Sequence, residues 1–291
     1  VGLFLTPFIL DYISKEEFGS FSLAQSTILL LGLINFGFVG ALDVLAAREI
    51  NFKKNISSYA GITATIQLFV AIVGCLVGFI ISFYFHDWFE IKTENKFEIQ
   101  LVVILLSLSF LFTIFGSTYS SLMIAFKEIH LNNLLSITST IINAIIVYVL
   151  LTNEYGLVSL AISICFCQLL KASYCYYRVK SKYNFLKITL FKFNKNDFKK
   201  LFKVGIWFFI GSISVLLIEK FDSILTGKLI DTKTIAVLVI SSKLFQLSKS
   251  LLFTVSNNFR PYFSTLIGNQ EKERAYDIYK NLRHFSTILA I

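Results

Sequence analysis

Residues 99–125 read IQLVVILLSLSFLFTIFGSTYSSLMIA and contain no Lys, Arg, Asp or Glu. A helix needs about 20 mostly apolar residues to cross the hydrocarbon core of a bilayer, so this stretch is long enough to span a membrane. The whole chain has the same character, because 55% of its 291 residues are hydrophobic and only 15% are charged. A typical soluble domain has about 25% charged residues. The composition therefore predicts an all-α integral membrane protein.

Similar apolar runs recur along the chain and predict a polytopic bundle of about eight to nine spans. The predicted spans are residues 1–10, Phe18–Leu42, Tyr59–Phe85, Ile99–Ala125, Leu134–Leu151, Leu157–Tyr174, Val204–Leu229 and Thr234–Phe259, and a ninth begins near Leu282. The sequence starts at Val1 inside one apolar run and ends at Ile291 inside another. We therefore expect a piece of a longer protein, cut at both ends.

Basic residues are divided unequally between alternate loops. The loops after the even-numbered predicted spans contain 17 Lys and Arg residues, and those after the odd-numbered spans contain 5. Membrane proteins concentrate Lys and Arg in their cytoplasmic loops. The even-numbered spans are therefore predicted to end in the cytoplasm. The net charge of +9 is then explained by topology, and no nucleic-acid partner is expected.

The longest basic segment, Arg178–Lys203, is the predicted domain boundary. It divides a first helix bundle (residues 1–177) from the start of a second bundle (residues 204–291). The segment is expected to be a basic cytoplasmic connector. Its interleaved Phe and Leu residues leave two interpretations open. It either lies on the inner leaflet with its Lys residues on anionic headgroups, or is a plain connector.

Two predicted spans carry ionisable residues, which cost about 2.5–3.5 kcal/mol near the bilayer centre and usually face a cavity or a partner. On the eighth span, five polar side chains fall within about 120° of arc. They are Lys243, Gln246, Lys249, Asn257 and Arg260. On the seventh span, Ser212, Glu219, Asp222, Ser223 and Thr226 share about 100° of arc, and Lys220 lies between the two acidic residues.

These stripes have two interpretations. In the first, the acidic stripe of the seventh span pairs with the basic stripe of the eighth and stabilises the fold. In the second, both line an aqueous cavity that binds an anion such as a pyrophosphate, because Lys and Arg suit phosphate. The candidate substrate-binding residues are then Lys243, Lys249, Arg260, Lys220, Gln246 and Asn257. Glu219 and Asp222 are candidates for coupling a proton or cation.

Several segments resemble the polysaccharide-export flippases, which carry O-antigen and capsule units within the multidrug/oligosaccharidyl-lipid/polysaccharide superfamily. The first resemblance is a Pro near the end of the first helix and an S-x-E-E-F-G turn, in PFILDYISKEEFGSFSLAQS (residues 7–26). The others are LINFGFVGAL (residues 33–42), FDSILTGKL (residues 221–229) and RPYFSTL (residues 260–266). The sequence departs from the family pattern at Asn35, where an acidic residue is frequent, and at IAVL (residues 235–238), where Gly-x-Tyr is usual.

The resemblance implies a fold of two helix bundles that face each other across a central cavity. It also implies a flippase in the bacterial cytoplasmic membrane that moves an undecaprenyl-pyrophosphate-linked oligosaccharide. The expected partners are membrane lipids, this lipid-linked oligosaccharide, a glycan polymerase and glycosyltransferases. A multidrug antiporter of the same superfamily is the alternative, but it should have an acidic cavity. A membrane polymerase or acyltransferase is a third possibility, which the short outer loops disfavour.

No catalytic, metal-binding or cofactor-binding motif is recognisable in the sequence, so the chain is not expected to be an enzyme or to hold a cofactor. The four cysteines, Cys75, Cys165, Cys167 and Cys175, lie in or beside apolar runs and are interpreted as packing residues. Asn35 is interpreted as a packing residue of the first bundle, where Gly32, Gly37 and Gly40 permit close helix approach.

Overall fold

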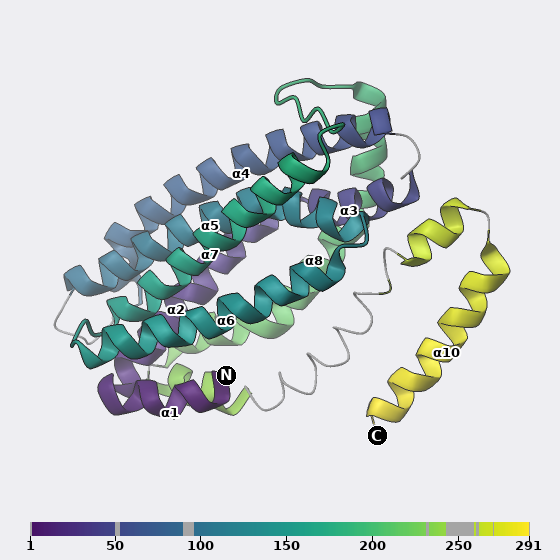
Figure 1. Ribbon diagram of the computed structural model, residues 1–291. Coiled ribbons are helices and arrows are strands. Elements are labelled where there is room, and N and C mark those ends of the chain that lie inside the picture. Colours follow the sequence, from purple (N-terminus) through teal and green to yellow (C-terminus); the bar gives the residue numbers. More distant parts are fainter. Residues whose placement is uncertain are drawn as a thin grey trace.

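The computed structural model describes residues 2–49, 53–89, 96–230, 233–242, 259, 262–269 and 271–290 (Figure 1). These residues form helices and short connections, without a β-strand among them. The helices are α1 (Gly2–Tyr12), α2 (Lys15–Leu30), the 3₁₀ helix η1 (Leu31–Asn35), α3 (Phe38–Arg48), α4 (Lys53–Trp88), α5 (Lys96–Ala125), α6 (Ile129–Thr152), α7 (Val158–Lys182), α8 (Lys195–Leu229) and α10 (Lys272–Ala290). Residues Lys233–Ser242 and 262–268 are also helical.

Five helices among the described residues are long and apolar enough to cross a membrane. They are Lys15–Asn35, Asn55–Trp88, Lys96–Ala125, Ile129–Thr152 and Val158–Lys182. α8 covers the seventh predicted span and, at 35 residues, is about 52 Å long at 1.5 Å per residue. The prediction of an all-α, multi-pass membrane protein is confirmed.

The prediction that Phe18–Leu42 forms a single helix is wrong, because this stretch is divided between α2, η1 and α3. After α2 the chain forms the more tightly wound 3₁₀ helix η1. It then turns at Phe36 (φ 49°) and Gly37 (φ 70°) before α3 begins. The side chain of Asn35 stabilises this turn, because its Oδ1 accepts a hydrogen bond from the Gly37 backbone N–H at 2.8 Å. Asn35 therefore shapes a helix break, and its predicted role in helix packing is replaced by a turn-forming one.

The start of α2 is set by the S-x-E-E motif. The Ser14 side chain accepts from the backbone N–H of Glu17 at 3.2 Å, and the Glu17 carboxylate accepts from the backbone N–H of Ser14 at 2.8 Å. This reciprocal capping box satisfies two backbone donors that the helix itself leaves free. The motif that carries the family resemblance is thus a helix start signal.

Other boundaries also shifted. α7 continues to Lys182 and α8 already begins at Lys195, so the non-helical part of the basic connector is only residues 183–194. α10 begins at Lys272, ten residues before the start predicted for the ninth span at Leu282. Only residues 234–242 and 259 of the eighth predicted span lie within the described part of the chain. The added turns of α8 and α10 contain Asn, Asp, Glu and Lys residues, so a search for apolar runs does not detect them.

Residues 183–194 lie against the first bundle. The backbone N–H of Phe191 donates to Thr65 Oγ1 of α4 at 3.0 Å, and the rings of Tyr183 and Phe126 stack with centroids 4.3 Å apart. The side chains of Phe191 and Phe193 are nevertheless 76% and 57% exposed. The segment therefore combines a docked backbone with exposed aromatic rings, and both interpretations of the connector stay open.

Two sets of side-chain contacts mark the two ends of the bundle. At one end, Lys228 Nζ donates to the Trp88 carbonyl at 2.9 Å, and Glu98 Oε1 accepts from the Leu157 N–H at 2.8 Å. This end holds the loops after the odd-numbered predicted spans. The loops after the even-numbered spans meet at the opposite end, through contacts such as Arg178–Glu128 and Ser58–Asp197. We call this second end the basic end, since 17 of the 22 loop Lys and Arg residues belong to its loops.

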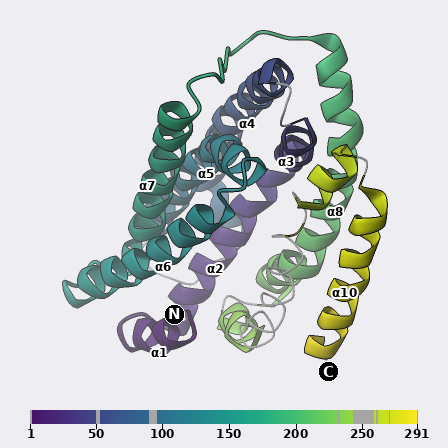
Figure 2. The ribbon, with the colours of Figure 1, turned by 45° about the vertical axis from the view of Figure 1, so that its right-hand side comes forward.

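α5 is the central helix of the first bundle and packs against α2, α3, α4 and α7. α8 lies along α2 and α3, on the side of the bundle away from α7 (Figure 2). Glycines allow this approach of α8. A Cβ added to Gly40 would lie 2.7 Å from the Phe208 ring, and one added to Gly37 would lie 2.7 Å from the Phe209 backbone nitrogen. Gly37 and Gly40 therefore do permit close packing, as predicted, but the helix that approaches them is α8, which lies outside the first bundle. Gly32 faces Phe110 of α5.

Gly37→Ala tests the contact between α3 and α8. The new methyl group would occupy a left-handed backbone conformation and press on the backbone of α8, so we expect the protein to lose about 2–4 kcal/mol of stability. Thermal unfolding in detergent micelles measures this loss. Gly211→Ala on α8 is the matched control, because no described atom outside its own stretch of helix lies within 4 Å of its added Cβ. An equal loss in the two variants would show that α3 and α8 do not pack as described.

Candidate substrate-binding groove

The first turns of α8 have a basic face. Lys200, Lys203 and Trp207 occupy positions i, i+3 and i+7, which fall within about 60° of arc. All three side chains are exposed, and Trp207 is 72% exposed. The end of α3, with the exposed side chain of Arg48, forms the opposite wall. The two helices enclose an open groove of about 730 Å³ at the basic end, lined by Val44, Leu45, Arg48, Glu49, Lys200, Lys203, Val204, Trp207 and Phe208. We call it the basic groove.

Among the described residues that line the basic groove, Glu49 supplies the one carboxylate, and it already has two partners. The Tyr59 hydroxyl donates to Glu49 Oε1 at 3.0 Å, and Asn55 Nδ2 donates to Glu49 Oε2 at 2.7 Å. The three cations of the groove therefore outnumber its single carboxylate. An anion that binds here would meet an excess of positive charge.

The position of Lys200 is fixed by the first bundle. Its Nζ donates to the Tyr59 hydroxyl at 3.3 Å and lies 5.9 Å from the centroid of the same ring. Tyr59 is completely buried, so its hydroxyl is a rigid support. One turn earlier on α8, the buried side chain of Asp197 accepts a hydrogen bond from Ser58 Oγ at 2.5 Å. α4 thus holds the first turns of α8 and, with them, one wall of the basic groove.

The helical segment 262–268 meets the other wall. Ser264 Oγ donates to the carbonyl of Val44 at 2.8 Å, and a Cβ added to Gly268 would lie 2.8 Å from the carbonyl oxygen of Arg48. Ser264 and Leu266 are both buried. The last turn of α3 therefore contacts two parts of the chain that follow the connector, α8 and residues 262–268.

A second polar cluster at the basic end ties α7 to the loop between α5 and α6. Glu128, whose side chain is 5% exposed, accepts from Arg178 Nη2 at 3.0 Å and from Lys182 Nζ. Burial alone would raise the pKa of the Glu128 carboxyl. The hydrogen bonds and positive charges of Arg178 and Lys182 outweigh this effect and lower its pKa below the ordinary value. Burial and the nearby Glu128 charge raise the pKa of Tyr183 to about 12, so its hydroxyl stays neutral.

The structure describes few of the side chains predicted to bind substrate. Lys243, Gln246, Lys249, Asn257 and Arg260 lie outside the described residues. Glu219 and Lys220 are on α8, but the structure describes only their backbone. Asp222 is exposed on α8 and makes no hydrogen bond or ion pair with another described residue. The predicted cationic cavity and the coupling role of Glu219 and Asp222 therefore stay predictions.

Sequence reasoning missed the basic groove. In the sequence, Arg48, Lys200 and Lys203 contribute only to the count of loop charges, and nothing marks Trp207 as their neighbour in a groove. The i, i+3, i+7 spacing of Lys200, Lys203 and Trp207 is visible once α8 is extended back to Lys195. The Asn194–Asp197 sequence is a signal for that start, since the Asn194 side chain accepts from the Asn196 N–H at 3.0 Å and caps the helix.

The groove can bind a phosphate group. The Arg48 guanidinium offers paired donors that match phosphate oxygens, and Lys200 and Lys203 offer ammonium donors from the other wall. The exposed Trp207 ring is an amphipathic group of the kind that lies at the membrane interface. Within the described part of the chain, no three His, Cys, Asp or Glu side chains gather as metal ligands would.

Comparison with known proteins gives one family. A family described as polysaccharide biosynthesis protein matches residues 3–267 of the chain. The chain matches no curated protein and no solved structure.

Glu128→Gln tests the cluster that ties α7 to the α5–α6 loop. At neutral pH we expect this variant to lose about 1–3 kcal/mol of stability, since Arg178 and Lys182 lose a charged acceptor. The folded-state pKa of Glu128 is lowered, so the stabilisation is complete above its ordinary value of 4.5 and is lost as the pH falls through the lowered pKa. Thermal unfolding of both proteins between about pH 7 and pH 3 measures the difference, which should shrink as the pH falls below the ordinary pKa of 4.5.

The control for this experiment is Glu271→Gln, which removes an exposed pair with Arg274 and should change stability by less than about 1 kcal/mol. A difference between wild type and Glu128→Gln that does not depend on pH would contradict the charged cluster.

Proposed function

Because the chain belongs to the polysaccharide biosynthesis protein family, we propose that it moves a lipid-linked oligosaccharide across the bacterial cytoplasmic membrane. The family membership and the membrane-spanning helices make it a polysaccharide-related membrane transporter. The proposed cargo is an undecaprenyl-pyrophosphate-linked unit of O-antigen, capsule or a related glycan. The chain would act by alternating access and carry out no covalent chemistry.

The basic groove is the observation that carries this proposal. Its cations come from two walls, Arg48 on α3 and Lys200 and Lys203 on α8, and its one carboxylate is occupied by Tyr59 and Asn55. A pyrophosphate has the charge and the oxygen acceptors that such a groove selects. If the groove opens at the membrane–water interface, it also admits a head group whose lipid tail stays in the bilayer.

The position of the groove suggests which step it serves. The charge distribution favours a cytoplasmic position for the basic end, and the lipid-linked oligosaccharide is proposed to be supplied on that side. The groove would bind the pyrophosphate there, and rocking of α8 and the following helices against the first bundle would carry it inward. Lys243, Lys249, Arg260, Lys220, Gln246 and Asn257 are proposed to line the later part of the route. Glu219 and Asp222 are proposed to bind the coupling ion.

The alternative transporter is a multidrug antiporter, which exports cations. An excess of positive charge in the basic groove repels such a substrate, so we favour an anionic one. A glycan polymerase and glycosyltransferases are proposed as partners, since they consume and supply a lipid-linked oligosaccharide.

Neutralising the basic groove tests the proposal. In a bacterial strain that lacks its own flippase, we expect the protein to restore surface glycan. The Lys200→Gln/Lys203→Gln variant should export at least about tenfold less, because it loses two charge-assisted contacts to the pyrophosphate. Surface glycan is measured by gel and immunoblot at equal protein level.

Lys199→Gln is the matched control, because Lys199 is exposed on α8 but lies outside the groove. It should export normally. Lys243→Ala/Lys249→Ala tests the later part of the route in the same strain. Normal export by the Lys200→Gln/Lys203→Gln variant would refute the role of the groove, and failure of the unmodified protein to restore any glycan would refute the proposed cargo.

A further inference from the structure

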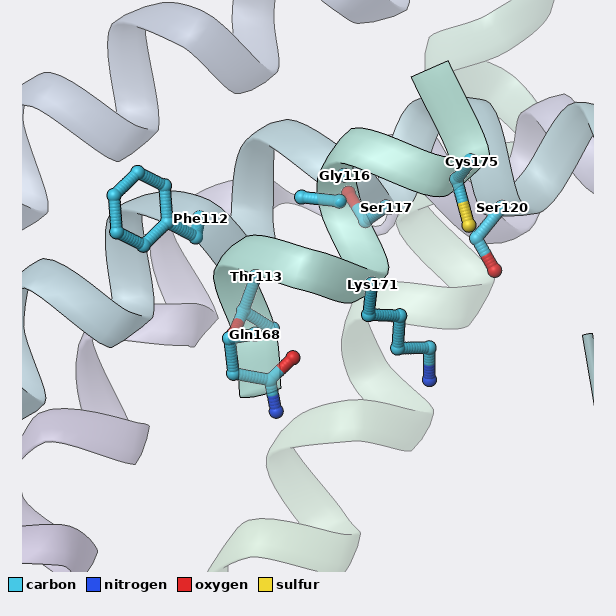
Figure 3. Close-up of a pocket in the computed structure, with 9 residues that line it drawn as sticks. Phe112, Thr113, Gly116, Ser117, Ser120, Gln168, Lys171 and Cys175 are labelled. Carbon is cyan, nitrogen blue, oxygen red and sulfur yellow. The ribbon is translucent and has the colours of Figure 1, made fainter. Parts of the chain in front are cut away.

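A second polar pocket lies between α5 and α7, away from the basic groove. Figure 3 shows Gln168 and Lys171 projecting from the same side of α7, next to Thr113 of α5. Thr113, Ser117 and Ser120 occupy positions i, i+4 and i+7 of α5, so they share one face of that helix. The pocket has a volume of about 150 Å³. Both helices are candidate membrane spans, so this is a polar site inside the membrane region.

Lys171 is a cation without a counter-charge in the part of the chain that the structure describes. Its Nζ donates to Ser136 Oγ of α6 at 3.1 Å and reaches no carboxylate among those residues. The Glu128 carboxylate at the same end of the bundle is already shared by Arg178 and Lys182. An uncompensated charge in a membrane span is costly and is retained where it binds something. An anionic ligand would remove that cost.

The pocket has further donors for such a ligand. The Gln168 amide makes no hydrogen bond to another described residue, although the side chain is half-buried. Ser120 Oγ is held by Asn132 Oδ1 at 2.8 Å and Ser117 Oγ by the Ile114 carbonyl at 2.6 Å. Lys171 and Gln168, one helical turn apart, therefore have N–H groups available to donate hydrogen bonds to a ligand.

The depth of the pocket matches a lipid head group. α5 has 30 residues and is about 45 Å long, against a hydrocarbon core of about 30 Å, so each end of a centred helix extends about 7 Å beyond it. Ser120 lies five residues before the end of α5 at Ala125, which is about 7.5 Å. The outer part of the pocket is thus at the boundary of the hydrocarbon core. Tyr174 and Tyr177, exposed on the next turns of α7, are residues typical of this depth.

Charge and size select the ligand. A phosphate diester carries one negative charge, which the single Lys171 ammonium neutralises, whereas a pyrophosphate carries more charge than this pocket can balance. The pocket has room for one such group and not for an oligosaccharide. On α6, Leu134, Ile137 and Ile141 are 55%, 57% and 48% exposed and offer an apolar surface for acyl chains. We propose that this pocket binds the phosphate of an anionic glycerophospholipid from the leaflet at the basic end.

Lipid binding to purified variants tests this site independently of transport. Native mass spectrometry of the protein in detergent would measure binding of dioleoylphosphatidylglycerol, dioleoylphosphatidylcholine and inorganic phosphate. Phosphatidylglycerol should bind more tightly than phosphatidylcholine. Lys171→Gln should weaken phosphatidylglycerol binding about tenfold, since one charge-assisted contact is lost. Lys171→Arg keeps the charge and should retain binding to within about threefold.

Lys180→Gln is the control for a general loss of positive charge, because Lys180 is exposed on the same helix and outside the pocket. Its phosphatidylglycerol affinity should equal that of the wild type. Equal affinity of Lys171→Gln and wild type would overturn the site. Lys171-dependent binding of inorganic phosphate without binding of phosphatidylglycerol would overturn the lipid as its ligand. Thermal unfolding of each variant shows whether a loss of binding comes from misfolding. If Lys171→Gln is misfolded, a folded Lys171→Arg variant should still bind phosphatidylglycerol more tightly than phosphatidylcholine, and loss of that preference would overturn the site.

Discussion

The contact between the start of α3 and α8 determines how the rest of the molecule is arranged. Gly37 and Gly40 let α8 approach at Gly205–Phe209, where a side chain on Gly37 would collide with the α8 backbone and one on Gly40 with the Phe208 ring. This approach requires the helix break at Leu31–Gly37, which turns α3 away from α2. The break in turn depends on the left-handed backbone of Phe36 and Gly37 and on the Asn35 side chain. One short polar turn in an apolar span thus sets where the chain beyond the connector meets the first bundle.

The basic groove is a consequence of that geometry. α3 and α8 touch at the glycines, and at the basic end the side chains of Arg48, Lys200 and Lys203 line the groove between them. Tyr59 holds one anionic and one cationic side chain of the groove in place, since its hydroxyl donates to Glu49 and accepts from Lys200. The Glu128 cluster holds the neighbouring end of α7. The proposed binding of an anionic lipid-linked cargo depends on this fixed first bundle and on the basic groove beside it.

Much of the fold could be predicted from the sequence, because membrane spans and loop charges are signals of composition. The resemblance to polysaccharide-export flippases is confirmed by the family match, and the apolar run 99–125 lies within α5. The break at Phe36 was missed because most of the residues around it are as apolar as their neighbours, and the one polar signal, Asn35, was interpreted as a packing residue. The groove was missed because Lys200 and Arg48 lie far apart in the sequence, and their proximity depends on the α3–α8 contact. Lys171 was overlooked inside an apolar run, although a lone cation in a span is itself a signal.

The central claim is that the seam between α3 and the chain beyond the connector opens during transport. A disulfide between Val44→Cys and Ser264→Cys tests it directly, because Ser264 Oγ donates to the Val44 carbonyl at 2.8 Å in this structure. Flipping of a fluorescent lipid-linked oligosaccharide would be measured in proteoliposomes before and after oxidation, with each single-cysteine variant as a control. The account predicts that oxidation stops flipping in the double variant and that a reductant restores it. Undiminished flipping by the fully cross-linked protein would contradict the account.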